Sequence, residues 1–591
     1  MNIYVGSIIL GGLLAAQSNA VEVFPKPGWR ETPNPFASPE AVTGGELTAC
    51  GFQYPKSFNY YLDNNSFSAD LFGALYESLL SLNPASPDYE PGLAEKWSIS
   101  DDQRTFTFWL NPKARWSDGL PVTAADVKWT FDALVNPDNL TGAHKVALEK
   151  FKTPVIINDH CLCFTTTEVH WRNLGAVGGL LVLPKHAFET LDFNKINFEF
   201  PVVSGPYRLA LIKEGISATL ARRADWWNRN APSSRGFANF QTLRFKFFES
   251  QETAFEAFKK GDLDLFPVYT ARLWINETGG DKFAKNWIVK QKVSNYEPIG
   301  FQGLAMNMRR PPFDDVRVRK ALCHVINRDR MNSTLMYNQY FLHRSYYEDL
   351  YDSAHPCPNP LTAYNKEEAR RLLAESGWKA NPATGLLEKN GHPFRIRFLE
   401  RESGVGKFLT IIAEDLKDVG IDMQIDSKDQ AAWTRDMDEF NFDMTWAAFS
   451  SSLFKDPEGP WSSREADRKM GTNITGFKDK RVDDLIEKQK TIFDVATRHG
   501  ICREIDRIVF ENYPYALLWN IRYRRLVYWN KFGTPPTILG KYNNENGAYW
   551  YWWVDPDSAA DLKDAMQKNL PLPRRPAEVN FDAVFPGSGG R

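Results

Sequence analysis

The chain has 591 residues, of which 43% are hydrophobic and 24% are charged. Lys and Arg number 71 against 73 Asp and Glu, so the formal net charge is −2 and the basic surface of a nucleic-acid-binding protein is excluded. A single hydrophobic core rarely supports this length, so we expect two or three domains of ordinary globular composition.

Residues 1–20 are typical of an export signal. An apolar core runs from Ile8 to Leu14, and small residues follow it up to Ala20, as at a cleavage site. The core is too short to span a bilayer, and no Cys follows it closely to carry a lipid anchor. The usual basic residue before the core is missing. We nevertheless expect a cleaved signal peptide and an exported protein without a lipid anchor.

The next segments alternate between strand and helix patterns. Residues 46–51 predict a short strand, and residues 54–65 predict a polar and aromatic loop. Residues 66–80 have helical periodicity, with Leu71 and Leu75 on one face. This order of elements indicates a mixed α/β chain from its start.

The most fully specified stretch covers residues 91–131. Residues 105–110 alternate between apolar and polar side chains, as in a half-buried strand. Asp118 and Gly119 mark a turn. Thr123 and Asp126 have the spacing of a capping box before a helix. A strand, a tight turn and a capped helix are therefore predicted with little chain between them.

The six cysteines could form up to three disulfides in an oxidising compartment, but their spacing does not give the connectivity. His160, Cys161 and Cys163 stand close together, within a strand-like run over residues 155–164. No second Cys or His pair follows at zinc-like spacing. We expect buried strand cysteines here and no metal site.

Later segments repeat a helix-then-strand order, which favours α/β domains. The predicted elements are a strand over 208–220, a helix from Gln251 that stops at Gly261, helices capped by Asp315 and Asn365, a helix over 407–419 and a strand over 421–425. Residues 570–591 are rich in Pro and Gly and are expected to lie on the surface.

Seven motifs occur in the order found in one protein family. They are GLAEKW at 92–97, WSDGLPVTAADVKWTF at 116–131, SGPYRL at 204–209, FKKGDLDL at 258–265, LAMNMRRPPFDDVRVRKAL at 304–322, YNKEEARRLLAESGW at 364–378 and LKDVGIDMQI at 416–425. With them the chain resembles the family 5 extracellular solute-binding proteins, the cluster C type that serves peptide and nickel ABC importers. RGFANFQTLRFKFF from Arg235, YNQYF near Tyr337 and YWYWWVD from Tyr549 resemble the YejA-type branch.

This resemblance implies an α/β, periplasmic-binding-protein-like fold, with two lobes around a hinged cleft. The first lobe would combine residues 21–65, 200–290 and 510–591, with residues 66–199 as an inserted subdomain and residues 291–509 as the second lobe. It also implies a periplasmic monomer that binds short peptides and delivers them to a membrane permease with its ATPase subunits. No cofactor, metal or nucleic acid is implied.

A carrier of varied peptides should hold the groups that all peptides share, so it needs exposed strand edges and a carboxylate for the ligand amine. The candidates for main-chain pairing are Phe58, Asn59, Tyr60 and Tyr61 in the first lobe and Ala447, Ala448, Phe449 and Ser450 in the second. The resemblance suggests Trp446 as a pocket residue and Asp456 as the amine partner, although their spacing is longer than in the family. Asp456 equally fits an Asx turn or a helix cap before Pro457.

Three further side chains are candidates for the cleft. Trp433 and Arg435 lie in a helix-like segment before the strand that contains Trp446, and Arg401 ends the strand pattern over 394–399. Arg401 could hold a ligand carboxylate. A solvated surface position is the alternative for both arginines.

The rival class is a secreted hydrolase. The chain has no His-Glu-x-x-His motif, no Gly-x-Ser-x-Gly elbow and no Ser-x-x-Lys set with its companion motifs. We therefore predict no catalytic residues and no enzyme. Within the same fold, a carrier of a nickel chelate or a sugar, or a ligand sensor, stays open as an alternative to a peptide carrier.

Overall fold

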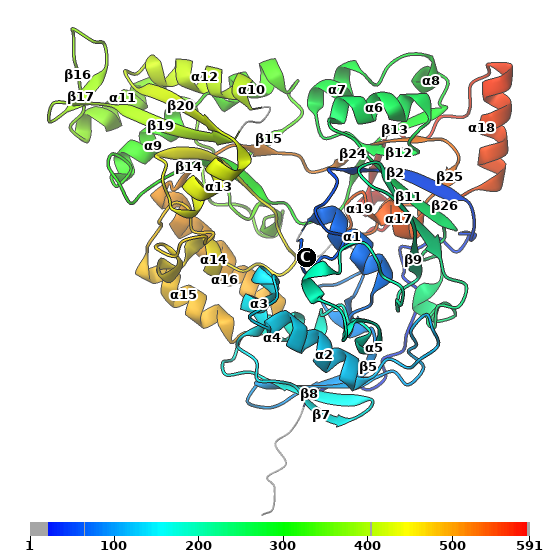
Figure 1. Ribbon diagram of the computed structural model, residues 1–591. Helices are drawn as coiled ribbons and strands as arrows, with labels where there is room; N and C mark the ends of the chain where they lie inside the picture. Colours follow the sequence, from blue (N-terminus) through cyan, green and yellow to red (C-terminus); the bar gives the residue numbers. More distant parts are fainter. Residues whose placement is uncertain (1–21, 64, 402–404, 588–591) are drawn as a thin grey trace, which may run out of the picture.

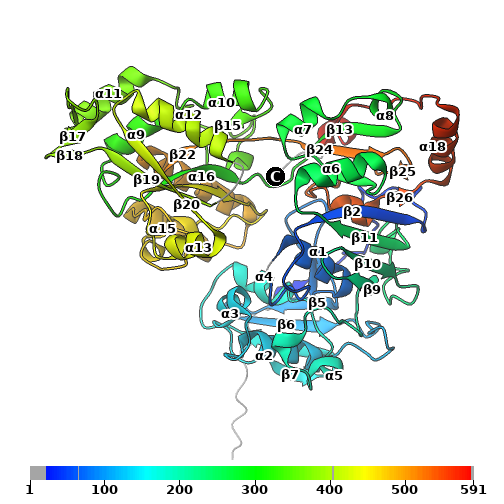
Figure 2. The same cartoon turned by 45° about the horizontal axis from the view of Figure 1, so that its top comes forward.

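The computed structural model describes residues 22–63, 65–401 and 405–587, which fold into two bodies built on separate large sheets (Figure 1, Figure 2). The first body has an eight-stranded mixed sheet in the order β27-β13-β24-β12-β2-β11-β10-β9. Its strands are β2 (Glu46–Phe52), β9 (Tyr207–Lys213), β10 (Ser217–Arg222), β11 (Thr242–Phe247), β12 (Leu265–Pro267), β13 (Ile288–Ser294), β24 (Arg524–Trp529) and β27 (Glu578–Asn580). Its helices are α1 (Ser66–Leu75), α6 (Gln251–Lys260), α7 (Ala271–Asn276), α8 (Asp281–Ala284), α17 (Gly547–Tyr551), α18 (Pro556–Lys568) and α19 (Phe581–Val584).

The second body has a five-stranded sheet in the order β20-β19-β21-β14-β22. Its strands are β14 (Phe301–Met306), β19 (Arg395–Arg401), β20 (Asp422–Lys428), β21 (Met444–Phe449) and β22 (Tyr515–Leu517). Its helices are α9 (Val316–Val325), α10 (Arg328–Leu335), α11 (Lys366–Glu375), α12 (Gly406–Lys417), α13 (Gln430–Asp438), α14 (Glu458–Trp461), α15 (Lys480–Lys490) and α16 (Val495–Asn512).

A third sheet, in the order β1-β5-β6-β8-β7, extends the first body downwards in Figure 1. Its strands are β1 (Glu22–Phe24), β5 (Ala94–Ile99), β6 (Thr105–Leu110), β7 (Val155–Asn158) and β8 (Cys161–Thr165). The helices that accompany it are α2 (Ala124–Val135), α3 (Gly142–Leu148), α4 (Arg172–Gly178) and α5 (Lys185–Phe188). We call the part of the chain from residue 66 to residue 199 the inserted segment.

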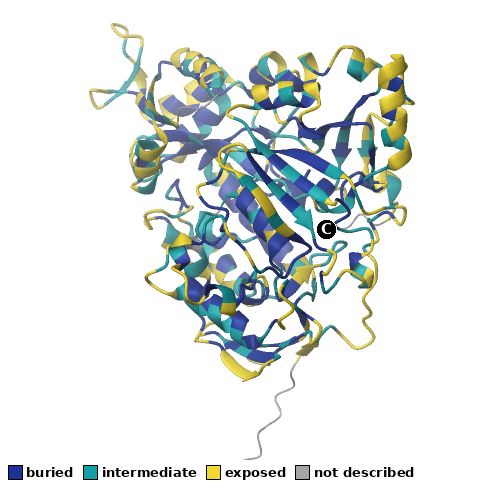
Figure 3. Ribbon diagram, turned by 45° about the vertical axis from the view of Figure 1, so that its right-hand side comes forward, coloured by how far each residue is buried: buried dark blue, intermediate teal, exposed yellow. Residues whose placement is uncertain are grey.

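The hydrophobic cores follow the same division. One continuous cluster joins the eight-stranded sheet to the inserted segment, because it contains Leu243 of β11 together with Phe108 of β6. The second body has clusters of its own around Leu304 and Phe301 of β14. Buried residues run along the strands of both bodies, and exposed residues cover outer helices such as α18 (Figure 3). The inserted segment is therefore packed as part of the first body.

The described chain passes between the two large sheets through two short segments. Residues 295–300 join β13 to β14, and residues 521–523 join the short strand β23 (Trp519–Asn520) to β24. Two extended crossings between separately packed cores are the arrangement of a hinge. The predicted fold class, with two α/β lobes joined by a hinge, agrees with this architecture.

Two strands pair outside the lobe ranges that the sequence suggested. Strand β1, from the range 21–65, pairs with β5 in the sheet of the inserted segment. Strand β22, from the range 510–591, pairs with β14 in the second body. Strand β22 stays in the second body because it follows α16 directly, and the chain crosses to the first body only after β23.

The elements predicted between residues 91 and 131 are present. Strand β6 alternates between half-buried and buried residues along its length. Gly119 adopts a φ of 90°, and its amide donates to the Trp116 carbonyl at 3.0 Å to close the turn. The Asp126 carboxylate accepts from the Thr123 amide at 2.8 Å, which completes the capping box at the start of α2.

Three local predictions need correction. The helix expected over 66–80 ends at Leu75, and residues 80–82 form a strand, β3, although Leu79 stays buried. The run over 155–164 is a hairpin of β7 and β8, because Asp159 and His160 form a turn. The strand expected over 208–220 is likewise a hairpin, of β9 and β10, with its turn at residues 214–216. The described part of the tail lies largely on the surface, as expected, and its strand β27 pairs with β13 at the edge of the eight-stranded sheet.

Among the described residues, no helix is both long enough and apolar enough to cross a membrane.

Candidate functional site

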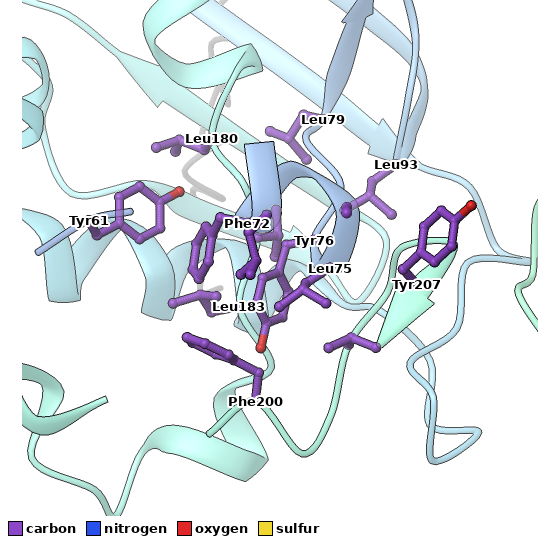
Figure 4. Packing of buried hydrophobic residues seen from close by; sticks show 14 of the residues in the cluster. Tyr61, Phe72, Leu75, Tyr76, Leu79, Leu93, Leu180, Leu183, Phe200 and Tyr207 are labelled. Carbon is purple, nitrogen blue, oxygen red and sulfur yellow. The ribbon is translucent and has the colours of Figure 1, made fainter. Parts of the chain in front are cut away.

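The first-lobe candidates lie in a loop whose side chains face the core. Phe58 and Asn59 are fully buried, Tyr61 is 4% exposed and Tyr60 is half-buried. The Phe58 amide donates to the Asn197 carbonyl at 2.9 Å, so its backbone is already paired. Tyr61 packs near α1, and its hydroxyl donates to the Leu181 carbonyl at 2.7 Å (Figure 4). Of the four side chains, Tyr60 alone is partly exposed, and its ring packs against Tyr61 and His144.

The second-lobe candidates lie on β21, and hydrogen bonds around its neighbour β14 show which way their backbone groups point. The Leu518 amide donates to the Gln302 carbonyl at 2.9 Å, so even-numbered residues of β14 face β22. The Asn307 amide donates to the Asp443 carbonyl at 2.9 Å, so odd-numbered residues of β14 pair with odd-numbered residues of β21. The N–H and C=O of Ala448 therefore point away from β14.

The edge of β21 at Ala448 is open. Strand β19 pairs with β21 at Met444 and Thr445, and the ladder between the two strands ends there. Among the described residues, no strand pairs with β21 on this side beyond Thr445. Ala447 is 8% exposed, and Ala448 and Ser450 are exposed. The second body thus presents unpaired main-chain groups at the end of a central strand.

Trp446 is held in the second body by three contacts. Its Nε1 donates to Gln302 Oε1 at 3.1 Å, and its ring packs against Phe408 and Trp519 at centroid distances of 5.8 and 5.7 Å. The side chain is half-buried. Trp446 therefore shapes the surface beside the open edge.

Arg401 and Trp433 come together, whereas Arg435 stays separate. The Arg401 guanidinium lies 5.8 Å from the centre of the Trp433 ring, and its Nη1 donates to Gln430 Oε1 at 3.1 Å. Arg401 is exposed and Trp433 is half-buried. Arg435 is exposed on α13. Arg401 and Trp433 form a positively charged aromatic surface. Arg435 occupies a solvated surface position, the alternative that the sequence left open.

A cavity of about 680 Å³ lies where β21 ends and the two crossings meet. Phe449 and Ser450 line it, as do residues 294–300 and 520–524 of the crossings. Residues 580–582 near the C-terminus close another part of its wall. A cavity of this size fits a small organic ligand or a short peptide segment. We refer to it as the hinge pocket.

The charged groups of the hinge pocket are largely paired. The Arg524 Nε donates to Glu297 Oε2 at 2.6 Å, and Arg524 also lies 3.4 Å from Glu545. Burial raises the pKa of the Glu297 carboxyl, and the bond from Arg524 opposes that rise. Arg522 pairs with Glu348 at 3.0 Å. The pocket wall is therefore polar and its charges balance one another.

The sequence prediction missed the crossings as site residues. Asn295, Pro298 and Gly300 are turn-forming residues between two strand patterns, and this signal could have marked the first crossing. The second crossing carries Arg522 and Arg524, which a search for ligand-binding arginines could have singled out. Neither segment has the helix or strand periodicity on which the prediction relied.

Asp456 lies away from the open edge and is bound by another residue. Its carboxylate forms an ion pair with Arg172 of α4, and its Oδ1 accepts from the Glu458 amide at 3.1 Å. The second bond is the turn that the sequence offered as the alternative. Asp456 thus connects the second body to the inserted segment.

The six cysteines are all within the described residues and are all unpaired. Cys161 is buried in β8, and Cys163 is partly exposed. Among the described residues, no group of three His, Cys, Asp or Glu side chains is placed to hold a metal ion.

Comparison with known proteins identifies the family. The model of the middle region of the bacterial extracellular solute-binding proteins, family 5, matches residues 88–470, which is more than half of the chain. The chain belongs to this family. The predicted membership is thus confirmed, and the family consists of solute-binding proteins rather than enzymes.

The relatives of this family 5 protein include the YejA branch that the motifs suggested. The uncharacterised protein YejA of Escherichia coli is 26% identical over 581 residues, covering 90% of this chain and 92% of its own. A probable peptide-binding protein YejA of Agrobacterium fabrum is 27% identical over 491 residues, covering 76% and 79%. The structure of the oligopeptide-binding protein AppA of Bacillus subtilis, in complex with a nonapeptide, superposes with a TM-score of 0.69 at 21% identity, covering 87% of this chain and all of AppA. This last likeness confirms the fold.

Proposed function

We propose that this family 5 protein is the substrate-binding component of an ABC importer and captures short peptides between its two bodies. The observation that carries the proposal is the open edge of β21 at Ala448, directly beside the hinge pocket. An extended peptide can add to such an edge through main-chain hydrogen bonds, which all peptides offer regardless of sequence. The relative named as a probable peptide-binding protein supports the same ligand class.

Closure would complete the site. The open edge belongs to the second body, while Tyr60 and residues 294–295 belong to the first body. A ligand that touches both bodies stabilises the closed arrangement by its differential affinity for it. The hinge then converts peptide binding into a shape that a membrane permease and its ATPase subunits can distinguish. Such a carrier acts in the periplasm as a monomer and without catalysis.

The ligand amine still needs a partner in this proposal. Asp456, which the family resemblance suggested, is already engaged by Arg172. Arg401 and the Trp433 ring offer a positively charged surface that suits a ligand carboxylate. We propose these two residues as the place where the carboxyl end of a peptide binds.

The decisive experiment uses the purified full chain. Mass spectrometry of small molecules released by denaturation should detect peptides, and isothermal titration with tri- and tetra-alanine should give saturable binding after refolding. A released nickel chelate or sugar, with no heat from either peptide, would overturn the peptide assignment and favour another ligand in the same fold.

A further inference from the structure

The second body touches the inserted segment at a charged contact that lies outside the hinge pocket. Arg172 of α4 contacts Glu458 of α14 there, and Trp171, just before α4, contacts Lys490 of α15. The contact groups the acidic residues Asp456 and Glu458 with cationic residues from both sides.

Glu458 is the centre of this contact. Its side chain is 8% exposed, and it accepts from Arg172 at 3.0 Å, from Lys490 at 2.9 Å and from Arg464. The ring of His170 lies 3.6 Å from the same carboxylate. Burial alone would raise the pKa of the Glu458 carboxyl, but the neighbouring His170, Lys490 and Arg172 hold it well below its usual range. The carboxylate is therefore ionised and depends on its cations.

The partners of Glu458 come from both bodies. Arg172 and His170 belong to the inserted segment, which shares its core with the eight-stranded sheet. Arg464 and Lys490 belong to the same body as Glu458 itself. Because the covalent links between the bodies are the two crossings, opening of the hinge must break the bonds from the inserted segment. The bonds from Arg464 and Lys490 survive.

Aromatic and main-chain contacts surround the ion pairs. The Trp171 amide donates to the Lys490 carbonyl at 2.9 Å, and its Nε1 donates to Gln489 Oε1 at 2.9 Å. Tyr89 of the inserted segment stacks on Phe454 of the second body at 5.6 Å. These contacts join the two bodies beside the ion pairs.

One loop connects this contact to the hinge pocket. Ser450 and Ser451 line the pocket at the end of β21, and Asp456 follows in the same loop. Lys455 fixes the loop to its own body, because its Nζ donates to Asp349 Oδ2 at 2.6 Å and both side chains are buried. The pocket wall and the charged contact are thus joined by a few residues of one loop, which is anchored to the second body.

We propose that Arg172 and Glu458 form an interlobe latch, a pair of positioning residues that hold the closed state and set how long a ligand is retained. The role in ligand retention rests on the proposed function, whereas the latch itself does not. Neither side chain lines the hinge pocket. Loss of Arg172 removes the guanidinium that both Glu458 and Asp456 receive from the other body, and breaking one side of a partly buried ion pair is unfavourable.

The chain provides a matched control. Arg172 and Arg464 both place a guanidinium on Glu458, but Arg464 does so from the same body as Glu458. Their side chains are 43% and 65% exposed, so replacing either one leaves the cores intact. R172A should therefore open the latch, and R464A should leave it closed.

The first measurement needs no ligand. Hydrogen exchange of the full-length protein, followed at the Trp171 amide that bonds across the contact, should be faster by at least about tenfold in R172A than in wild type. R464A should exchange like wild type. Equal protection in R172A and wild type, or equal loss in both variants, would overturn the latch.

The second measurement separates the latch from the proposed function. Trialanine should dissociate at least about tenfold faster from R172A than from R464A, with thermal unfolding midpoints alike in the two variants. If trialanine binds neither variant nor wild type while the exchange difference persists, the latch stands and the peptide assignment fails. Equal dissociation rates, with binding intact, would show that the latch does not set ligand retention.

Discussion

At the scale of single residues, the role of a charged side chain can be assigned only when the groups that it contacts are known. Asp456 follows the family pattern closely enough to suggest amine binding, but the structure gives its carboxylate to Arg172. The guanidinium of Arg401 instead lies over the ring of Trp433 and donates to Gln430. Sequence spacing alone could not separate these two situations, because both depend on residues far away in the chain.

Replacement of Asp456 tests whether its carboxylate binds the ligand amine or acts through Arg172. We expect D456A to weaken the binding of tetra-alanine and of its N-acetylated form by the same factor, because the change acts through Arg172 and closure rather than through the ligand amine. Titration calorimetry with the two peptides measures this ratio. A much larger loss for the free-amine peptide would restore Asp456 as the amine partner.

Glu77 provides a test at the same scale that depends on pH. Burial raises the pKa of the Glu77 carboxyl to about 7, although the indole groups of Trp226 and Trp227 donate to it. An acid with a raised pKa binds its proton more tightly in the folded protein than in the unfolded chain. Its contribution to stability is therefore present at low pH and is lost as the pH rises from about 4.5 to about 7.

The variant E77Q keeps an acceptor for the indoles and cannot ionise. Between pH 5 and pH 8 we expect the free energy of unfolding to fall less in E77Q than in wild type. The two decreases should differ by at most about 1.4 kcal/mol for each unit by which the pKa of Glu77 differs between the folded and the unfolded chain. Urea unfolding at the two pH values measures this difference. Parallel behaviour of E77Q and wild type would contradict the raised pKa.

At the scale of elements, strands and helices with strong local signals were predictable. The capping box of Thr123 and Asp126 and the alternation of β6 specify their structure within a few residues. The open edge of β21 was only partly predictable. Its residues were candidates, but the direction of the Ala448 backbone depends on pairing with β14, and its exposure depends on where the β19 ladder ends.

The tail shows the opposite limit. Its Pro and Gly content predicted a surface segment, and the described residues of the tail lie largely on the surface, but Phe581 is 1% exposed and packs against Phe36. The pairing of β27 with β13 joins residues that are 286 positions apart, as between Lys292 and Glu578. Composition cannot reveal such a long-range pair.

The β21 edge can be tested with proline. A448P removes the N–H that faces the open edge, whereas A447P removes an N–H that faces β14. We expect A448P to weaken tetra-alanine binding by about 3- to 10-fold, the effect of one hydrogen bond, with little change in thermal stability. We expect A447P to lower the unfolding midpoint. Unchanged peptide binding in A448P would mean that ligands do not pair with this edge.

At the scale of the whole molecule, two sheets and two crossings explain how a binding protein can both hold and release its ligand. The hinge pocket lies where the crossings meet, and the latch of Arg172 and Glu458 lies at a separate contact between the same two bodies. A ligand and the latch therefore stabilise the same closed arrangement from different places. The affinity for the ligand can therefore change through substitutions in the hinge pocket or through substitutions in the latch, independently of each other.

The order of the strands also affects when each body can be completed as the chain is synthesised from its N-terminus. All five strands of the second sheet are present once residue 517 has emerged. In the first sheet, β24 stands between β13 and β12, so that sheet stays divided until residues 524–529 arrive. The sheet of the second body can thus be complete while the sheet of the first body still lacks β24. The protein becomes able to close only after its last tenth has been synthesised.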